Sequence, residues 1–552
     1  MKTLVYNAKV YLRRGTFAGA VLVDGDRIVS VGTSEDLLDR VPAGVRKVDA
    51  GGALLLPGFY DSHLHLQELG RFERQINCGG AVSVGEIVGW GRDFIEKNRI
   101  PPGKMVLGFG IDQDLFTQSE KRYPTRADLD KISAVHPVIL LRVCGHVALC
   151  NSRALELAGI ADKVPVIEGG VVETGEDGRP SGVLKENAAS LVRALFPKPS
   201  PGDLVLRLEA AMKTALSYGV TSAATHDTMG PDFQAVRAAY TQILTGNGAG
   251  TATEKRVPMR IVMQCGSADK DRYLDEYIKE GLVTGTVFVK DYLKMGPLKF
   301  FADGSLGSHT AALREPYDDS PGSRGVPAMG NALLKDLVRK ADAAGLQTGI
   351  HAIGDAAIEA VIETFEALPP ESSRRRHGVI HCQITDSGLL DRMARRGVVA
   401  IVQPAFLAHD LHIAEKRLGS VRAATSYAWG SMEKRGIRSA YGTDCPIEHV
   451  NPMQGIAAAV TRQDREGCPE GGFYPEERVD VATAVGNYTA GSAYANFDET
   501  RLGRIKEGYL ADMALWDTDI FTCPPDAIRQ AKTLWTMVGG GYPMPHAKRA
   551  QP

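Results

Sequence analysis

Short apolar segments separated by glycine and aspartate occupy both ends of the chain. Three of them lie near the N-terminus, and a fourth, residues 501–517, repeats the pattern of a glycine-bounded turn followed by an apolar run. Such runs predict β-strands, and a few short strands need a second layer to bury their apolar faces. We therefore predict one small β-sandwich built from residues 1–56 and residues 486–552.

Between these ends, residues 57–485 alternate strand-like and helix-like stretches, which is typical of a parallel α/β fold. Helix-like sequence at 273–279 and 332–344 separates successive apolar segments. The candidate strands are residues 54–61, 219–227, 260–264, 298–304, 346–355, 378–383, 397–404 and 436–444. Eight parallel strands close a (β/α)8, TIM-like barrel, and we predict this α/β architecture.

One stretch is too long for a connection within such a barrel. Residues 67–218 contain their own strand-like segments, a long helix-like segment and a hairpin signal in which Asp177-Gly178 lies between apolar arms. Connections of this length are functional or carry structure of their own. We predict an inserted subdomain that lies over the barrel mouth.

Composition narrows the classes of function and partner. The chain has 552 residues, of which 44% are hydrophobic, and a formal net charge of -2, which gives no reason to expect nucleic acid or a membrane surface as partner. The start lacks the pattern of a signal peptide, and no apolar run approaches the length of a membrane span. Eight cysteines without a CxxC pair indicate reduced thiols. We expect a cytoplasmic protein that acts on a small molecule, with a homodimer as the commonest assembly.

Four histidines and one aspartate stand at the carboxyl ends of predicted barrel strands. His63 and His65 are two residues apart, so their side chains lie on the same side of a strand, and His351, His381 and Asp444 end later strands. Each alone could be an ordinary hydrogen-bonded residue. Barrel enzymes hold their chemistry at this face, and imidazole and carboxylate are ligands of divalent metals. Together the five residues predict a metal site.

The same residues carry a family resemblance. HxH after the first strand, histidine after the fifth and sixth and aspartate after the eighth is the ligand order of the amidohydrolase superfamily. The phrases LLLPGFYDSHLHL, LKFFADGSLGSHTA, IHAIGD and EGYLADMALWD resemble its amidohydrolase family 3, which includes the N-substituted formamide deformylases. The resemblance spans almost the whole chain. It implies a barrel, a flanking β-sandwich and a divalent metal, usually zinc.

The resemblance also implies roles for the ligands. His63 and His65 would bind one metal ion, His351 and His381 a second or a shared one, and Asp444 would contact the metal and its water. Lys299 lies where many superfamily members have a carboxylated lysine that bridges two ions, because a carbamate offers oxygen ligands that an ammonium lacks. The alternative for Lys299 is a barrel lysine in an ion pair. One or two metal ions per chain remain open.

These roles predict a hydrolase that acts on carbon–nitrogen bonds other than peptide bonds. A metal lowers the pKa of its bound water toward about 7, and Asp444 would act as general acid and base for the resulting hydroxide. The resemblance favours an amide or formamide with an apolar N-substituent. A cyclic amide, a carbamate or an ester is an alternative substrate, and a non-catalytic metal-binding regulator is an alternative function. A flavin or nicotinamide enzyme would need GxGxxG after the first strand, which is absent.

Weaker candidates complete the predicted site. The predicted substrate contacts are His146, Glu186, Asp303 and Gln403. Asp303 could instead cap a loop, and His226, at the end of the second strand, is equally compatible with a structural role. His309 stands where relatives commonly have arginine. The aromatic residues Trp90, Phe109 and Phe116 either line an apolar pocket or form the core of the insertion.

Overall fold

The computed structural model describes residues 2–117, 121–142, 147–167, 170–196, 199–228, 232–246, 257–266, 270–541 and 544–545. The chain divides into two compact units, one made of Met1–Leu66 and Ala211–Pro552 and the other of Gln67–Ala210. The first unit holds a barrel and a β-sandwich. The second is the long insertion, described separately below.

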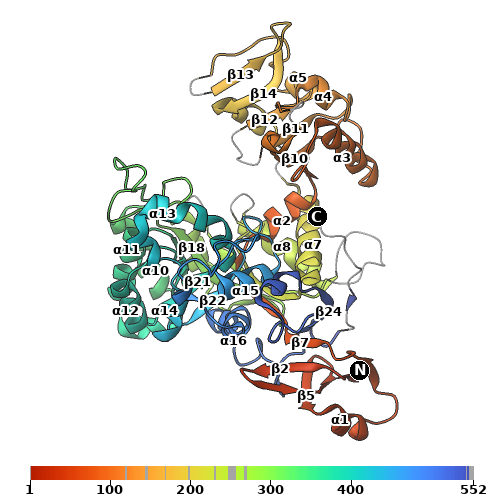
Figure 1. Ribbon diagram of the computed structural model, residues 1–552, viewed down its shortest axis with the longest axis vertical. Helices are drawn as coiled ribbons and strands as arrows, with labels where there is room; N and C mark the ends of the chain where they lie inside the picture. Colours follow the sequence, from red (N-terminus) through yellow and green to blue (C-terminus); the bar gives the residue numbers. More distant parts are fainter. Residues whose placement is uncertain are drawn as a thin grey trace. The chain divides into compact units, whose positions relative to one another are not determined.

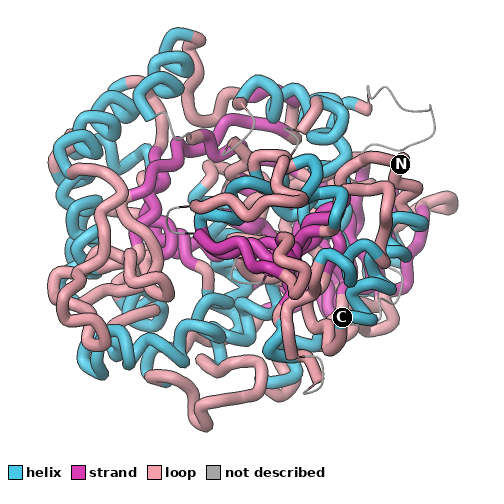
Figure 2. Tube along the Cα trace, turned by 90° about the horizontal axis from the view of Figure 1, so that it is seen from above, coloured by secondary structure: helices cyan, strands magenta, loops and turns pink. Residues whose placement is uncertain are grey.

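Eight parallel strands form a near-closed barrel, as predicted. In order around it they are β8 (Phe59–Leu64), β15 (Val220–Thr225), β16 (Arg260–Cys265), β18 (Leu293–Phe301), β19 (Thr348–Ala352), β20 (Gly378–His381), β21 (Val399–Val402) and β22 (Ser439–Tyr441). The helices of the barrel are α8 (Phe233–Thr245), α9 (Lys270–Lys279), α10 (Asn331–Ala343), α11 (Asp355–Glu366), α12 (Ser387–Arg396), α13 (Leu407–Ala424), α14 (Trp429–Lys434) and α15 (Pro452–Thr461). Figure 1 shows α10, α11, α12, α13 and α14 on the outer side of β18, β21 and β22, and Figure 2 shows helices outside a curved row of strands.

The first and last barrel strands are joined just beyond the end of β22. The amide N–H of Asp444 donates to the carbonyl oxygen of His63 at 2.8 Å, and the N–H of His65 donates to that of Cys445 at 2.8 Å. The approach is so close that a Cβ on Gly442 would lie 2.7 Å from the His63 nitrogen, which is why only glycine fits there. These bonds bring a histidine pair from one end of the barrel sequence against an aspartate from the other.

Two strands differ from the sequence prediction. Residues 54–61 form two strands, because the Pro57-Gly58 step separates β7 (Leu54–Pro57), which belongs to the sandwich, from β8 in the barrel. The fourth barrel strand begins at Leu293, five residues before the predicted start, where it pairs with β17 (Val287–Val289) in a hairpin. The β-branched and aromatic residues of β17 favour a strand, but the prediction treated this part as a connection.

Both ends of the chain share the β-sandwich, as predicted. One sheet has the order β5-β4-β1-β6 and the other β25-β24-β23-β7-β2-β3. The strands are β1 (Lys2–Tyr6), β2 (Lys9–Arg13), β3 (Thr16–Ala18), β4 (Ala20–Asp24), β5 (Arg27–Gly32), β6 (Arg46–Asp49), β23 (Met513–Trp516), β24 (Thr533–Met537) and β25 (Met544–Pro545). Strand β23 pairs antiparallel with β7, and a core cluster joins residues from both ends, such as Val21 and Met513. Residues 481–495 are helical, so the C-terminal share of the sandwich begins at β23.

The insertion has a sheet and cores of its own. Its strand order is β13-β14-β12-β11-β10-β9. The elements are β9 (Ile76–Asn77), α3 (Val84–Lys97), β10 (Val106–Ile111), α4 (Arg126–Asp130), β11 (Val138–Arg142), β12 (Val147–Cys150), α5 (Ser152–Leu157), β13 (Gly170–Thr174), β14 (Pro180–Glu186) and α6 (Ser190–Arg193), while α2 (Leu66–Glu73) and α7 (Pro201–Ser217) lie at its boundaries. The hairpin expected around Asp177-Gly178 is the β13–β14 pair. The apolar cluster of this unit includes Phe116, which fits the core alternative for that residue, whereas Trp90 is 37% exposed.

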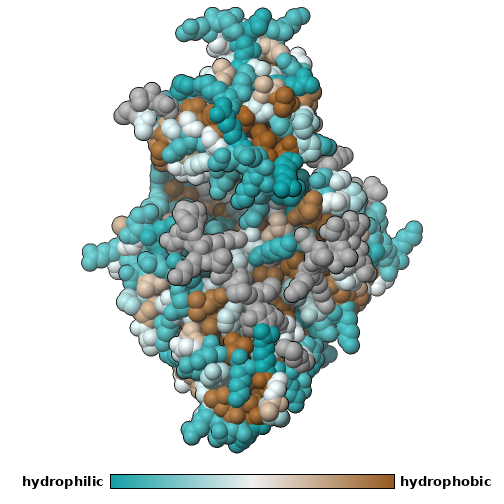
Figure 3. Space-filling model, turned by 90° about the vertical axis from the view of Figure 1, so that its right-hand side faces the viewer, coloured by the Kyte–Doolittle hydropathy of each residue, from teal (hydrophilic) through white to brown (hydrophobic). Residues whose placement is uncertain are grey.

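The surface has no extended apolar face in the view of Figure 3, where apolar patches alternate with polar residues. The large exposed apolar side chains are spread along the sequence from Phe17 to Leu534. Within the described ranges, no helix is both long and apolar enough to cross a membrane.

Candidate metal centre

His63 and His65 end strand β8 with one ring nitrogen of each already engaged. The Nδ1–H of His63 donates to Gln264 Oε1 at 2.6 Å, and the Nδ1–H of His65 donates to the carbonyl oxygen of His226 at 2.7 Å. Both acceptors are oxygens, so both protons must be on Nδ1 in the neutral rings. The Nε2 lone pairs are therefore left for another partner, which is how metal-binding histidines are usually oriented.

Asp444 faces both of these lone pairs. Its Oδ1 lies 3.0 Å from His65 Nε2 and 3.3 Å from His63 Nε2, and the ligand atoms of the three residues lie within 4.8 Å of one another. Burial would raise the pKa of Asp444, but the two imidazoles outweigh it and hold that pKa well below its usual range. Two nitrogen lone pairs and a carboxylate oxygen in this arrangement repel unless a cation lies between them.

Protonation of the two imidazole rings would also supply positive charge, but burial opposes protonation of His63. Burial, followed by the charge of Lys299, lowers the pKa of His63 well below its ordinary value. For His65 burial also acts to lower the pKa, but the hydrogen bond to Asp444 raises it overall. A single metal ion would satisfy all three ligands at once.

His351 and His381 complete the set of predicted histidines. Their ring centroids are 4.4 Å apart, and the ring of His381 is 5.8 Å from that of His63. The Nδ1–H of His381 donates to Gln403 Oε1 at 2.8 Å, while the Nε2–H of His351 donates to the carbonyl oxygen of Gly304 at 2.9 Å. Their remaining lone pairs are thus on Nε2 of His381 and Nδ1 of His351. The structure brings all four histidines and Asp444 to one end of the barrel.

Lys299 lies among these ligands and is 2% exposed. Its Nζ is 3.1 Å from His63 Nε2, and within the described part of the chain it makes no ion pair within 4.0 Å. The ion-pair alternative therefore has no carboxylate partner there. Burial lowers the pKa of Lys299 to about 7, with Asp444 acting in the opposite direction, so a large share of the amine is neutral near neutral pH.

Two residues that hold the site were not predicted. Gln264 accepts from His63, and its Nε2 donates to the carbonyl oxygen of Ser62 at 2.9 Å. Asp61, which is fully buried, accepts from the N–H of His63 at 3.1 Å and from the hydroxyl of Thr443 at 2.6 Å. Gln264 does end a predicted strand, and Asp61 is two residues before His63. Their positions were therefore available from the sequence, but their partners were not.

The predicted substrate contacts fall in different places. The carboxylate of Asp303 accepts three backbone N–H groups, from Ala312, Ile353 and Gly354, which corresponds to the loop-capping alternative. Gln403 orients His381, as described above. Glu186 ends β14 in the insertion, and His146 lies outside the described residues. Substrate contact by these residues stays a prediction.

His309 lies in a small polar cluster. Its Nε2 is 2.9 Å from Asp319 Oδ1, and Arg417 contacts both residues. The backbone of His309 has a φ of 56°, which fits a tight loop after β18. Through its contact with Arg417, His309 links the loop after β18 to helix α13.

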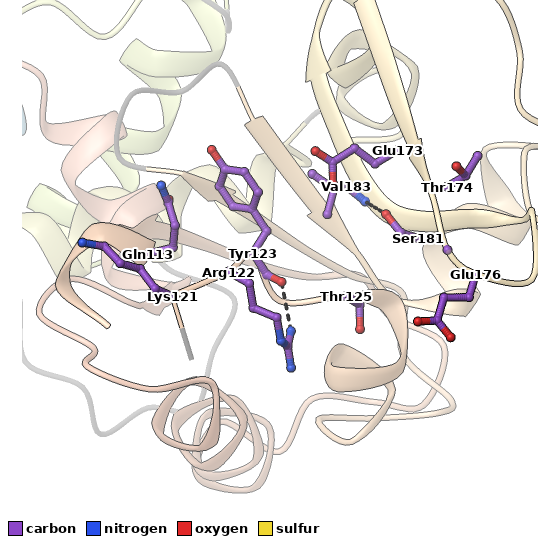
Figure 4. A pocket seen from close by; sticks show the side chains of 11 residues that line it. Gln113, Lys121, Arg122, Tyr123, Thr125, Glu173, Thr174, Glu176, Ser181 and Val183 are labelled. Atoms are coloured by element: carbon purple, nitrogen blue, oxygen red, sulfur yellow. Dashed lines mark hydrogen bonds between the residues drawn. The ribbon is translucent and has the colours of Figure 1, made fainter. Parts of the chain in front are cut away.

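An open depression of about 640 Å³ lies within the insertion (Figure 4). Arg122 and Tyr123 line one side, and Glu173 of β13 the other. Arg122 is paired with Asp128 at 2.6 Å, and Glu173 is paired with Lys185. Its described lining contains no histidine or cysteine, so its chemistry differs from that of the metal centre.

Comparison with known proteins gives matches over nearly the full length. Residues 46–541 match the sequence model of the Amidohydrolase family. The chain is 31% identical to the Bacillus subtilis (strain 168) protein YtcJ, named as an amidohydrolase, over 98% of this chain and 99% of that protein. It is 26% identical to an N-substituted formamide deformylase of Arthrobacter pascens, with 97% and 96% covered.

Solved structures give the same result. An uncharacterized metal-dependent hydrolase from Pyrococcus furiosus aligns with a TM-score of 0.75 at 27% identity, covering 95% of this chain and all of that one. A second, from Pyrococcus horikoshii OT3, aligns with a TM-score of 0.74 at 26% identity, covering 95% and 99%.

Proposed function

Because the chain belongs to the amidohydrolase family and has the fold of metal-dependent hydrolases, we propose that it hydrolyses the C–N bond of a small amide or formamide. The observation that carries the proposal is the cluster of His63, His65 and Asp444, whose ligand atoms converge with both Nδ1 atoms already committed. Such a cluster suits a divalent ion, and its nitrogen and oxygen donors favour zinc.

The donor set suits one or two ions. His63, His65 and Asp444 would hold the first, and His351, His381 and Lys299 would complete a second site or share the first. A carbamate formed on the neutral Lys299 amine by carbon dioxide would supply oxygen ligands for such an ion. The buried amine without a carboxylate partner supports this assignment. A bound divalent ion would acidify a water molecule and polarise the substrate carbonyl.

The protein's own residues then handle protons and orientation. Asp444 stays ionised near neutral pH and can take the proton of an attacking water molecule, then deliver it to the leaving nitrogen. Gln264 and the carbonyl oxygen of His226 keep the two imidazoles of β8 from rotating, so Asp444 meets the same geometry in each turnover. An amide requires both proton transfers because its amine is a poor leaving group.

The apolar N-substituent is proposed from two sources. The Arthrobacter relative is named for N-substituted formamides, and two phenylalanine rings lie beside the histidines. Phe406 stacks on His381 with centroids 5.7 Å apart, and Phe301 lies 5.3 Å from His351. These rings offer an apolar wall next to the reacting bond, which a small charged substrate would not use.

The test combines metal content with a substrate panel. We would measure metals by elemental analysis in wild type, His63→Ala and Lys299→Ala, and assay N-alkyl and N-benzyl formamides beside a cyclic amide, a carbamate and an ester. Matched controls are His136→Ala and Lys335→Ala, which change a histidine of the insertion and an exposed lysine of α10.

We expect hydrolysis of formamides by the wild type, with metal lost in His63→Ala and kept in both controls. About two zinc ions per chain, with one lost in Lys299→Ala, supports the carbamate bridge. Preferred hydrolysis of the ester or the cyclic amide would move the protein to the alternative substrate class. A wild type that neither contains nor takes up a divalent metal would contradict the proposal.

A further inference from the structure

Among the histidines of this region within the described residues, His226 alone has no ring nitrogen in a well-formed hydrogen bond. It follows strand β15 and is 1% exposed. Within the ranges that the structure describes, neither Nδ1 nor Nε2 makes a hydrogen bond of ordinary geometry, and the Gly266 backbone is only a weak partner of the ring. By contrast, His63, His65, His351 and His381 each use one nitrogen to donate to an oxygen.

The ring of His226 lies at the edge of the metal centre. Its centroid is 5.6 Å from that of His65 and 6.1 Å from that of Phe301. A Cβ placed on Gly266 would lie 3.2 Å from His226 Nε2 and 3.1 Å from Lys299 Cβ. The Nε2 edge is therefore turned across the end of β16 toward Lys299, and the absence of a side chain at Gly266 leaves room for it.

A structural role and a role as ligand both fit these observations poorly. A buried polar group that lacks a well-formed hydrogen bond costs about 1–3 kcal/mol, so packing alone does not account for a polar ring at this position. His226 lies beside His65, outside the cluster of His63, His65 and Asp444 whose ligand atoms converge. A group that is unpaired in the free protein, and adjacent to the reacting centre, is suited to a partner that arrives with the substrate.

We propose that His226 is a further catalytic residue, which donates a hydrogen bond from its ring to the carbonyl oxygen of the bound substrate. This inference rests on the proposed function. His65 lies between the two groups, with Nε2 toward Asp444 and Nδ1 bonded to the His226 backbone. Asp444 thus handles protons on one side of His65, and His226 stabilises the charge that develops on oxygen on the other. No proton is transferred by His226.

A donor role for His226 predicts that its removal lowers kcat without lowering the melting temperature. A donor fixed in a water-excluded site strengthens as the oxygen gains charge, and removing such a donor typically lowers kcat by about 10²–10³-fold. Replacing the same ring by phenylalanine removes a buried unpaired polar group, so the folded protein should keep or raise its melting temperature. Loss of activity without loss of stability separates a catalytic role from a packing role.

The experiment uses full-length, metal-loaded protein in three forms: wild type, His226→Phe and His226→Gln, which retains an N–H donor. His136→Gln, in the insertion, is the matched control for loss of a buried histidine. For each we would measure kcat and KM on an N-substituted formamide, metal content and melting temperature. We expect His226→Phe to lose about 10²–10³-fold in kcat with unchanged metal content and an equal or higher melting temperature, and His226→Gln to recover part of the rate.

Three results would overturn the inference. An active His226→Phe, within about tenfold of wild type in kcat, would show that the donor is not used. Metal loss in this variant would make His226 a ligand, and a lower melting temperature with restored activity at low temperature would make it structural. A metal-loaded wild type that hydrolyses no member of the substrate panel would contradict both the proposed function and the role of His226. An active wild type with an equally active His226→Phe variant would contradict only the role of His226.

Discussion

The two sides of the metal centre are built differently. On the side of β8 and β22, His63, His65 and Asp444 are held by Gln264, by backbone carbonyl groups and by the bonds that join the first and last strands. On the side of β15 and β18, His226 makes no well-formed hydrogen bond among the described residues, and Lys299 has the Nε2 of His63 at 3.1 Å and the ring of Phe301 at 5.0 Å from its Nζ. The first side keeps its shape before anything binds. We propose that the second obtains its partners from solution, as carbon dioxide or as substrate.

The largest effect should follow from changing the side that is held in place. In Asp444→Asn the side chain no longer accepts a proton, and we expect kcat/KM to fall by about 10⁴-fold, the upper range for a general acid and base. Steady-state kinetics on metal-loaded protein measure it. Asp318→Asn, which changes an exposed carboxylate paired with Arg422, is the control and should match wild type. A loss of less than tenfold in Asp444→Asn would remove Asp444 from proton transfer.

The second effect tests the side that recruits its partners. We expect Lys299→Ala to lose about 10²–10³-fold in activity, because the proposed carbamate would no longer help to hold the metal. Acetate or formate offers the same pair of carboxylate oxygens and should restore part of the rate as its concentration rises. Chloride at equal ionic strength is the control. Equal effects of acetate and chloride would contradict a bridge formed by carboxylated lysine.

A smaller effect compares the two glutamines that orient imidazoles. Gln264→Leu frees the ring of His63, and Gln403→Leu frees that of His381. Residues that orient metal ligands typically contribute 10–100-fold in metal affinity or activity, and we expect losses of about this size in each variant. Zinc titration with a competing chelator measures the affinity. Unchanged affinity in both variants would mean that packing alone orients the rings.

The smallest effect concerns a partly buried carboxylate of the barrel outside the ligand set. Burial raises the pKa of Asp410 to about 6, against the hydrogen bond from Tyr427, which lowers it. Because this folded-state pKa is above the unfolded value of 3.8, ionised Asp410 destabilises the fold, and the penalty grows as pH rises from about 4 to 6. Asp410→Asn should therefore gain stability relative to wild type at pH 8 but not at pH 4, by at most about 3 kcal/mol. Melting temperatures of wild type and Asp410→Asn at pH 4 and pH 8 test this prediction. An equal difference between the two proteins at both pH values would refute the raised pKa of Asp410.

Much of this arrangement was predictable because it depends on local pattern. Apolar segments of strand length predicted the barrel, and histidines at their carboxyl ends predicted the candidate ligands. The partner of His63 was not predictable, since Gln264 is 201 positions away and a glutamine at a strand end resembles any other polar residue. The role of His226 stayed open for the same reason: a missing hydrogen bond leaves no pattern in sequence. The split at Pro57-Gly58 was missed because an apolar run continues across it.

The pairing of β7 with β23 has a consequence for biosynthesis. Strand β7 leaves the ribosome just before the histidines of β8, whereas its neighbour in the sheet, Met513–Trp516, is made more than 400 residues later. Until then one edge of β7 is open to other chains, and unpaired edges are where nascent proteins aggregate. At about 5–20 residues per second, that exposure lasts tens of seconds, so the yield of folded protein should depend on translation speed and on chaperones that cover this edge.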